Sequence, residues 1–176
     1  MTTPDERQLR RLQLVDEHVR LENRHDLDGI MTTFGAAARY DDEPWDAHYV
    51  GRDGVRAFYS ELLRAMPDLA IDVQRRHVSD ATVILEVIIR GHQLGAWRGL
   101  PPTGRAVQFP LCGIYTFDAD DRLAGEKIYY DRATVLRQLG VLHEPDRFWG
   151  RVNAVVMHPV TMARITARMI GRRRVG

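Results

Sequence analysis

Two acidic stretches of the sequence carry side chains suited to proton transfer. In the first, Asp131 follows Tyr129 and Tyr130 at the end of a segment rich in aromatic and aliphatic residues. Such a segment can hold a carboxyl group in an apolar pocket, where loss of water raises its pKa and prepares it for general acid/base work. Because side chains alternate along a strand, only one of the two tyrosines should share the side of Asp131.

The same aspartate also fits a structural role. It stands directly before Arg132 and an apolar helical stretch, which is the position of a helix N-cap. The second acidic stretch leaves a similar choice open. Asp41, Asp42, Glu43 and Asp46 are typical of a solvated loop, yet Trp45, His48 and Tyr49 beside them would suit a pocket mouth.

The elements that must position these residues fall into two halves. Residue periodicity of about 3.6 predicts helices over 4–21, 27–34 and 54–66, with Thr3 and Asp53 as the first and third N-caps. A short strand at 37–41 and an irregular loop at 42–50 are expected between the second and third helices. After the third helix, alternation of apolar and polar residues predicts strands. The expected strands are 69–73, 82–90, 105–117 and 123–130. Helices first and antiparallel strands second indicate an α+β fold, with a curved antiparallel sheet and the helices packed into its concavity.

Composition narrows the class of protein further. The chain has 176 residues and a net charge of +1, which fits one ordinary globular domain with a core. Among the 25 basic residues only Lys127 is a lysine, which we interpret as the codon bias of a GC-rich, bacterial genome. The single cysteine, Cys112, excludes an internal disulfide, and the absence of a hydrophobic leader favours a cytoplasmic protein. The arginines form no basic face interleaved with aromatic residues, which argues against nucleic-acid binding.

Several segments together resemble the SnoaL-like polyketide cyclase family, within the NTF2-like superfamily. They are the loop Gly99–Arg105, the strand Phe109–Phe117, and Glu126–Asp131 followed by Leu136 and Gln138–Gly140. The resemblance covers about residues 5–142 and implies a cone-shaped α+β domain. It also implies aldol ring closure with no metal or organic cofactor, in which one aspartate, at the position of Asp131, acts as general acid/base.

Two departures from the family pattern suggest other site residues. Where related sequences carry Gly-Thr-His, this chain has His92 followed by Gln93, so either could take the place of the usual histidine. Comparison with the steroid-isomerase branch instead assigns the proton shuttle to Asp42 or Glu43. The tyrosine that donates to the enolate oxygen in that branch falls at His18.

We therefore carry three hypotheses: a cyclase-like enzyme with Asp131, an isomerase-like enzyme with Asp42 or Glu43, and a binding or interaction module without catalysis. The two enzyme hypotheses and the binding module expect a hydrophobic small-molecule ligand, whereas an interaction module would have a protein partner. The residues expected to line its site are Tyr129, Tyr130, His92, Gln93, Trp97, Asp42, His18 and Trp45, and no metal spacing is recognised.

The end of the chain is expected to be a separate segment. Residues 1–142 form the predicted domain, and 143–176 form a basic, apolar helical extension. Residues 151–176 contain six arginines and no acid, beside many aliphatic residues. We interpret this extension as a helix that packs on its own domain or on a second subunit, in preference to a segment that docks on a membrane surface, and the hypothesis we carry is a homodimer contact.

Overall fold

The computed structural model describes residues 5–142 together with Phe148, Val152, Val155, Val156, Pro159, Val160 and Arg164. The chain divides into two compact units, Met1–Leu139 and Gly140–Gly176. The expected extension and its dimer contact therefore lie largely outside the described residues and stay predictions. No helix in the described part of the chain has the length and apolar character needed to cross a membrane.

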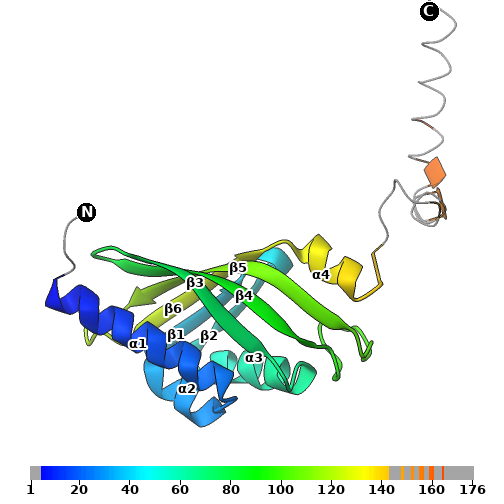
Figure 1. The fold of residues 1–176 in the computed structure, drawn as a ribbon. Helices are drawn as coiled ribbons and strands as arrows, with labels where there is room; N and C mark the ends of the chain where they lie inside the picture. The colour runs from blue at the N-terminus through cyan, green and yellow to red at the C-terminus, as the bar shows by residue number, and fades with distance from the viewer. Residues whose placement is uncertain are drawn as a thin grey trace, which may run out of the picture. The chain divides into compact units, whose positions relative to one another are not determined.

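The first unit is an α+β fold in which the three N-terminal helices lie on one side of a strongly bent sheet (Figure 1). The helices are α1 (Glu6–Asn23), α2 (Leu27–Thr33), α3 (Gly51–Ala65) and α4 (Arg132–Gln138), with a single 3₁₀ turn, η1 (Glu43–Trp45). The strands are β1 (Phe34–Asp42), β2 (Ala47–Val50), β3 (Ala70–Val78), β4 (Thr82–His92), β5 (Ala106–Phe117) and β6 (Leu123–Tyr130).

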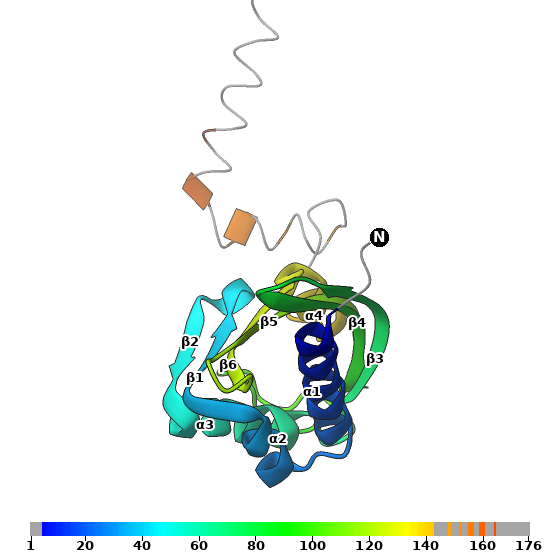
Figure 2. The same cartoon turned by 90° about the vertical axis from the view of Figure 1, so that its left-hand side faces the viewer.

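The sheet has the strand order β2-β1-β6-β5-β4-β3 and is not closed into a barrel. Figure 2 shows it bending around α1, with α2 and α3 below, so that the concave face is covered by helices. The alternation seen in the sequence decides which side chains face inward. In β4, Val83, Leu85, Val87 and Ile89 are all buried, as their period of two predicted. The α+β fold expected from the sequence is therefore confirmed.

Some local expectations were wrong. The first helix is capped by Asp5, whose side chain accepts a hydrogen bond from the Gln8 amide in a capping box, and the predicted cap, Thr3, lies outside the described residues. The third helix starts earlier than expected, after Val50, and Asp53 lies in its first turn. There a carboxylate stabilises the positive end of the helix dipole without capping it.

The loop expected at 42–50 contains both η1 and strand β2. The sheet is also mixed, because β1 pairs with β6 in parallel, with Tyr40 opposite Glu126 and Asp42 opposite Ile128. This pairing brings the first strand of the chain beside the last one. It places acidic and aromatic side chains from both ends of the sequence on the same concave face.

Candidate active site

An apolar cavity of about 60 Å³ lies between the concave face of the sheet and the helices. Helices α1 and α3 and strands β1, β3, β4, β5 and β6 all contribute to its wall. Aromatic and aliphatic side chains form most of the lining, and three carboxyl groups interrupt it: Asp42, Glu22 and Glu126. A mostly apolar pocket with a few converging polar groups is the usual form of a small-molecule site.

Asp42 ends strand β1 and has an almost fully buried side chain, 1% exposed. Arg98 Nη2 donates to Asp42 Oδ2 at 2.6 Å. Oδ1 finds no hydrogen-bond partner among the described residues. Burial raises the pKa of the Asp42 carboxyl, and the neighbouring Arg98 guanidinium opposes this without cancelling it. The Tyr130 hydroxyl also lies close enough to lower the pKa of Asp42, although it makes no hydrogen bond of normal geometry to Oδ1. One oxygen of the carboxylate is thus held by Arg98, and the other lies at the cavity near a phenol.

Arg98 is placed by a two-residue turn. Trp97 and Leu100 exchange backbone hydrogen bonds of 3.0 and 2.8 Å, and the residues between them both have positive φ, 51° at Arg98 and 77° at Gly99. Positive φ at both central positions is the geometry of a type I′ turn, which glycine adopts easily and arginine does not. A strained residue is thus held where its side chain can reach Asp42.

Aromatic rings surround this ion pair. The Arg98 guanidinium lies over the rings of Trp45, Tyr49 and Trp97 at 5.6 to 5.9 Å from their centroids. Trp45 Nε1 donates to the Tyr130 hydroxyl at 2.7 Å. Burial and the nearby Asp42 carboxylate raise the pKa of Tyr130 far above its usual value, so the phenol stays protonated. This end of the cavity is therefore dry, aromatic and equipped with hydrogen-bond donors.

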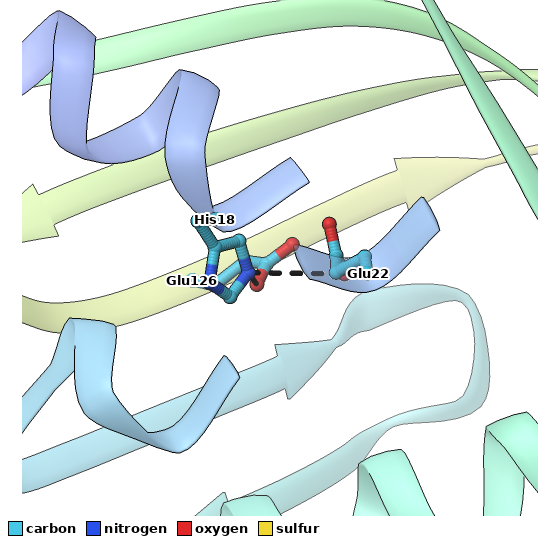
Figure 3. A group of neighbouring side chains, drawn as sticks. All are labelled: His18, Glu22 and Glu126. Atoms are coloured by element: carbon cyan, nitrogen blue, oxygen red, sulfur yellow. Dashed lines mark ion pairs between the residues drawn. The ribbon is translucent and has the colours of Figure 1, made fainter. Parts of the chain in front are cut away.

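A second set of polar side chains surrounds His18, which lies on α1 and is completely buried (Figure 3). Its Nδ1 lies 2.8 Å from Thr33 Oγ1, and its Nε2 lies 3.0 Å from the Tyr59 hydroxyl. Nε2 also faces Glu126 Oε2 at 3.3 Å and Glu22 Oε1 at 3.7 Å. We call these three ionisable residues, His18, Glu22 and Glu126, the histidine–glutamate cluster.

One ligand atom from each member of this cluster lies within 4.8 Å of the others, a spacing compatible with a metal ion. However, the Tyr59 hydroxyl stands between two of them, 3.0 Å from His18 Nε2 and donating to Glu126 Oε2 at 2.7 Å. A metal ion bound to His18 Nε2 and Glu126 Oε2 would have to break these two hydrogen bonds. The contacts therefore favour a hydrogen-bonded cluster over a metal centre.

The structure brings together four residues that the sequence named. Asp42, Tyr130 and Trp97 line the cavity, and Trp45 contacts Tyr130 and packs edge-on against Trp97, with ring centroids 5.7 Å apart. His18 lies in the histidine–glutamate cluster, whose two carboxyl groups also line the cavity.

Other candidates lie elsewhere. Asp131 is half exposed, at 58% of its side chain, and its carboxylate caps α4 by accepting from the Ala133 amide at 2.9 Å and the Thr134 hydroxyl at 2.5 Å. It lies beside Tyr129 in a shallow groove on the outside of the sheet, and its catalytic role stays a prediction. His92 is exposed and pairs with Asp68, Nδ1 to Oδ2, at 2.6 Å.

Gln93 is buried, but its side chain serves its own loop. Nε2 donates to the carbonyls of Gly95 and Pro101, both at 3.0 Å, and Oε1 accepts from the amide and the hydroxyl of Thr103 at 3.1 and 2.7 Å. These bonds fix the loop that carries Trp97 and Arg98. Gln93 thus positions cavity residues without lining the cavity itself.

Sequence reasoning missed Glu22, Glu126, Tyr59 and Arg98. Glu22 had a readable signal, since it lies four residues after His18 and so on the same helix face. Glu126 shares the inward face of β6 with Ile128 and Tyr130, as the alternation of that strand allows. Nothing in the sequence marked Arg98 as a site residue, because the type I′ turn that directs its side chain toward Asp42 is known only from the folded structure.

A bent six-stranded sheet around helices, with a cavity on its concave face, defines the NTF2-like class of folds. A family model for SnoaL-like polyketide cyclases matches residues 12–139, and the chain belongs to that family. A comparison with curated proteins gave no match.

Solved structures share the fold. AclR from Streptomyces galilaeus, a candidate hydroxylase, is 25% identical, with a TM-score of 0.67 over 78% of this chain and 89% of that one. A candidate SnoaL-like polyketide cyclase from Jannaschia sp. CCS1 is 20% identical, with a TM-score of 0.70 over 81% and 100%. A ketosteroid isomerase-like protein from Catenulispora acidiphila DSM 44928, solved with trimethylamine, is 18% identical, with a TM-score of 0.63 over 80% and 95%.

Proposed function

We propose that this protein is an enzyme that removes a proton from the carbon beside a carbonyl group of a hydrophobic small molecule. Aldol ring closure and double-bond migration both begin with this step, and neither needs a metal or an organic cofactor. Membership of the SnoaL-like polyketide cyclase family supports the substrate class. The named activities of structural neighbours, a hydroxylase and a pyran-forming cyclase-like enzyme among them, show that the fold serves several reactions.

One observation carries the assignment of the base. Asp42 lines the cavity with Oδ2 held by Arg98, while Oδ1 is buried without a partner among the described residues. Unpaired buried oxygens are costly and rare, and a substrate C–H group placed beside this one would meet a base whose pKa is already raised. We therefore assign the proton abstraction to Asp42, the alternative that the steroid-isomerase comparison named, and keep Asp131 as its rival.

A test of this assignment needs no knowledge of the natural substrate. Cyclohexanone and larger cyclic ketones are dissolved in D₂O with the protein, and the loss of the α-proton signals is followed by NMR. The wild type should accelerate exchange beyond the buffer rate. Asp42→Asn should remove about a hundredfold or more of that acceleration, because a positioned general base contributes on that order.

Asp131→Asn is the matched variant, since it removes a carboxylate outside the cavity and leaves an amide that still caps α4. It should exchange protons at the wild-type rate. If Asp131→Asn abolishes exchange and Asp42→Asn does not, the base is Asp131 and our assignment fails. If neither the wild type nor any variant accelerates exchange while the ketones still bind, the protein is a binding module.

The remaining expectations from the sequence belong to the same proposal: a bacterial, cytoplasmic homodimer. Light scattering of the full chain beside a variant that lacks residues 151–176 tests the part played by the extension. An unchanged mass in the shortened chain would remove the extension from the dimer contact.

A further inference from the structure

The proposed reaction leaves two cavity-lining carboxyl groups unused, those of Glu22 on α1 and Glu126 on β6. Proton abstraction beside a carbonyl creates negative charge on the carbonyl oxygen, and a site gains most of its rate from groups that stabilise that charge. A carboxyl group can do this only when it is protonated, because an ionised carboxylate has no proton to donate. The protonation of the histidine–glutamate cluster therefore decides what Glu22 and Glu126 can do.

The hydrogen bonds around His18 fix its first proton. The Thr33 hydroxyl donates its only proton to the Ile30 carbonyl at 2.7 Å. Thr33 Oγ1 must then accept in its 2.8 Å contact with His18 Nδ1. The proton in that contact therefore belongs to Nδ1.

Counting hydrogen-bond donors in the same way shows whether the other ring nitrogen, Nε2, carries a proton. The Tyr59 hydroxyl donates to Glu126 Oε2 at 2.7 Å, so it has no proton left for His18. The 3.0 Å contact between His18 Nε2 and the Tyr59 oxygen then requires a proton on Nε2. With both nitrogens protonated, His18 is a cation. Burial by itself would lower the pKa of His18. The negative charge of Glu22, together with the hydrogen bond and the charge of Glu126, outweighs burial and raises the pKa, and once Glu22 is protonated Glu126 alone supports the cation.

One cation cannot balance two buried carboxylates. Glu126 Oε2 lies nearer to the imidazolium than Glu22 Oε1 does, at 3.3 against 3.7 Å, and it also accepts from Tyr59. Glu126 therefore has both the nearer positive partner and a hydrogen-bond donor, and a proton on Glu22 removes the excess charge. Consistently, burial raises the pKa of Glu22 to about 7, with the negative charge of Glu126 adding to the effect and His18 opposing it.

From this arrangement we infer that Glu22 is a second catalytic group, a neutral carboxylic acid that donates a hydrogen bond to the carbonyl oxygen of the bound ketone. The inference rests on the proposed function. Asp42 takes the proton from carbon, the C–H electron pair moves into the new carbon–carbon double bond, and the carbonyl electrons move onto oxygen. The Glu22 hydroxyl stabilises that oxygen, while His18 and Tyr59 position the cluster.

The substrate class follows from this pairing. A base and an acid on one apolar wall fit an uncharged ketone better than a substrate acid. The carboxylate of such an acid would meet Glu126, and the cations beside the cavity in the described part of the chain, Arg98 and His18, already face Asp42 and Glu126. The titratable groups that face Glu22 come from every element around it. They are His18 on α1, Tyr40 on β1, Tyr59 on α3, Tyr115 on β5 and Glu126 on β6. Of these, the three tyrosines have strongly raised pKa values because of burial and stay protonated.

Binding of cyclohexanone, compared with methylenecyclohexane, tests the inference. The two molecules have nearly the same shape, but only the ketone accepts a hydrogen bond. The wild-type dissociation constant for cyclohexanone should rise by about fivefold or more between pH 6 and pH 8.5, as the donor is lost and an anion takes its place. Binding of methylenecyclohexane should change less. In parallel, the C=O stretch of bound cyclohexanone should lie at lower frequency at pH 6 than at pH 8.5.

Glu22→Gln keeps a donor of the same size but cannot ionise, so its affinity for cyclohexanone should be independent of pH. Glu17→Gln, on the same helix and exposed, is the matched control and should behave as the wild type. A wild-type affinity and C=O frequency that do not change with pH overturn the inference, and this result needs no variant to fold. A pH dependence that survives in Glu22→Gln overturns it too. Asp42→Asn should keep the pH-dependent binding, so failure of the proposed base and failure of Glu22 are distinguishable.

Discussion

Arg98 reaches Asp42 from the tip of a type I′ turn, and the contact between Arg98 Nη2 and Asp42 Oδ2 is 2.6 Å long. The arginine comes from the family-like loop before β5, and the aspartate ends β1. The pair therefore connects the loop to the wall of the cavity. It holds one oxygen of the carboxylate and leaves the other without a partner among the described residues.

Replacing Arg98 by methionine should destabilise the protein by about 2 kcal/mol at pH 7.5, because a nearly buried carboxylate then loses its cation. The loss should be smaller at pH 5, since the pKa of Asp42, already raised by burial, rises further and the group takes up a proton. Urea denaturation at both pH values measures this. The double variant with Asp42→Asn should recover part of the stability, and a purely additive result would mean that the two residues do not interact.

Gln93→Leu should cost about 2–3 kcal/mol of unfolding free energy, because it leaves two carbonyls and two donors of the loop without their partner. It should also weaken ketone binding, since Trp97 and Arg98 depend on that loop. Thermal and urea denaturation check the first effect and NMR titration the second. His92→Gln, at the next position and exposed, is the control. A stable Gln93→Leu protein with normal binding would contradict the role of Gln93 in the loop.

Stability should fall as the pH rises from about 5.5 to 8.5. Glu22 and His18 both have folded-state pKa values above their ordinary ones, so the folded state binds more protons, and its advantage is lost as pH passes through those values. For Glu22, a rise from 4.5 to about 7 amounts in full to roughly 3 kcal/mol, of which about 2 kcal/mol is lost between pH 5.5 and pH 8.5. Urea unfolding across this range measures it, and Glu22→Gln should flatten the profile. A wild-type profile that is level or rises would contradict the raised values.

Asp131→Ala should lower the melting temperature while Asp131→Asn leaves it nearly unchanged, because asparagine also caps helices. Hydrogen bonds from Thr134 and from backbone amides hold the pKa of Asp131 below its usual value, with Arg137 contributing. Its stabilising effect is therefore present above the unfolded-state pKa and is lost as pH falls through the folded-state pKa. Thermal melts at pH 7 and pH 3 test this. Equal melting temperatures for the two variants at pH 7 would argue against the cap.

Much of the fold was readable from local patterns, and the clearest is in β4, which repeats its buried residues with a period of two. Val83, Leu85, Val87 and Ile89 illustrate this, and the family-like loop and final strand identified the superfamily. The parallel pairing of β1 with β6 was not readable, since it joins strands that are far apart in the sequence and carry no local mark of their partner. The third helix began early because Gly51, at φ 76°, turns the chain directly from β2 into it.

The site was harder to predict than the fold, because its residues are far apart in the sequence and nothing local marks which of them meet. Asp42, Tyr130, Trp45 and Trp97 could be named as side chains suited to a pocket, but no spacing showed that they meet. His18 was named through a resemblance, and the spacing of four residues could have added Glu22, but nothing in the sequence shows that Glu126 on β6 lies 3.3 Å from His18. Asp131 stood out in the sequence because it follows two tyrosines, and the same position makes it an effective N-cap.

The pairing of β1 with β6 also orders events during synthesis. Glu22 leaves the ribosome long before Glu126, and Asp42 long before Ile128 opposite it. Until the last strand is made and docks, His18 has no carboxylate from β6, and the edge of β1 is open. Chains of such non-local pairing fold slowly. A nascent or prematurely terminated chain that ends before Leu123 would therefore possess α1, α2, α3 and Asp42, but neither β6 nor α4, and the wall that β6 gives the cavity would be missing.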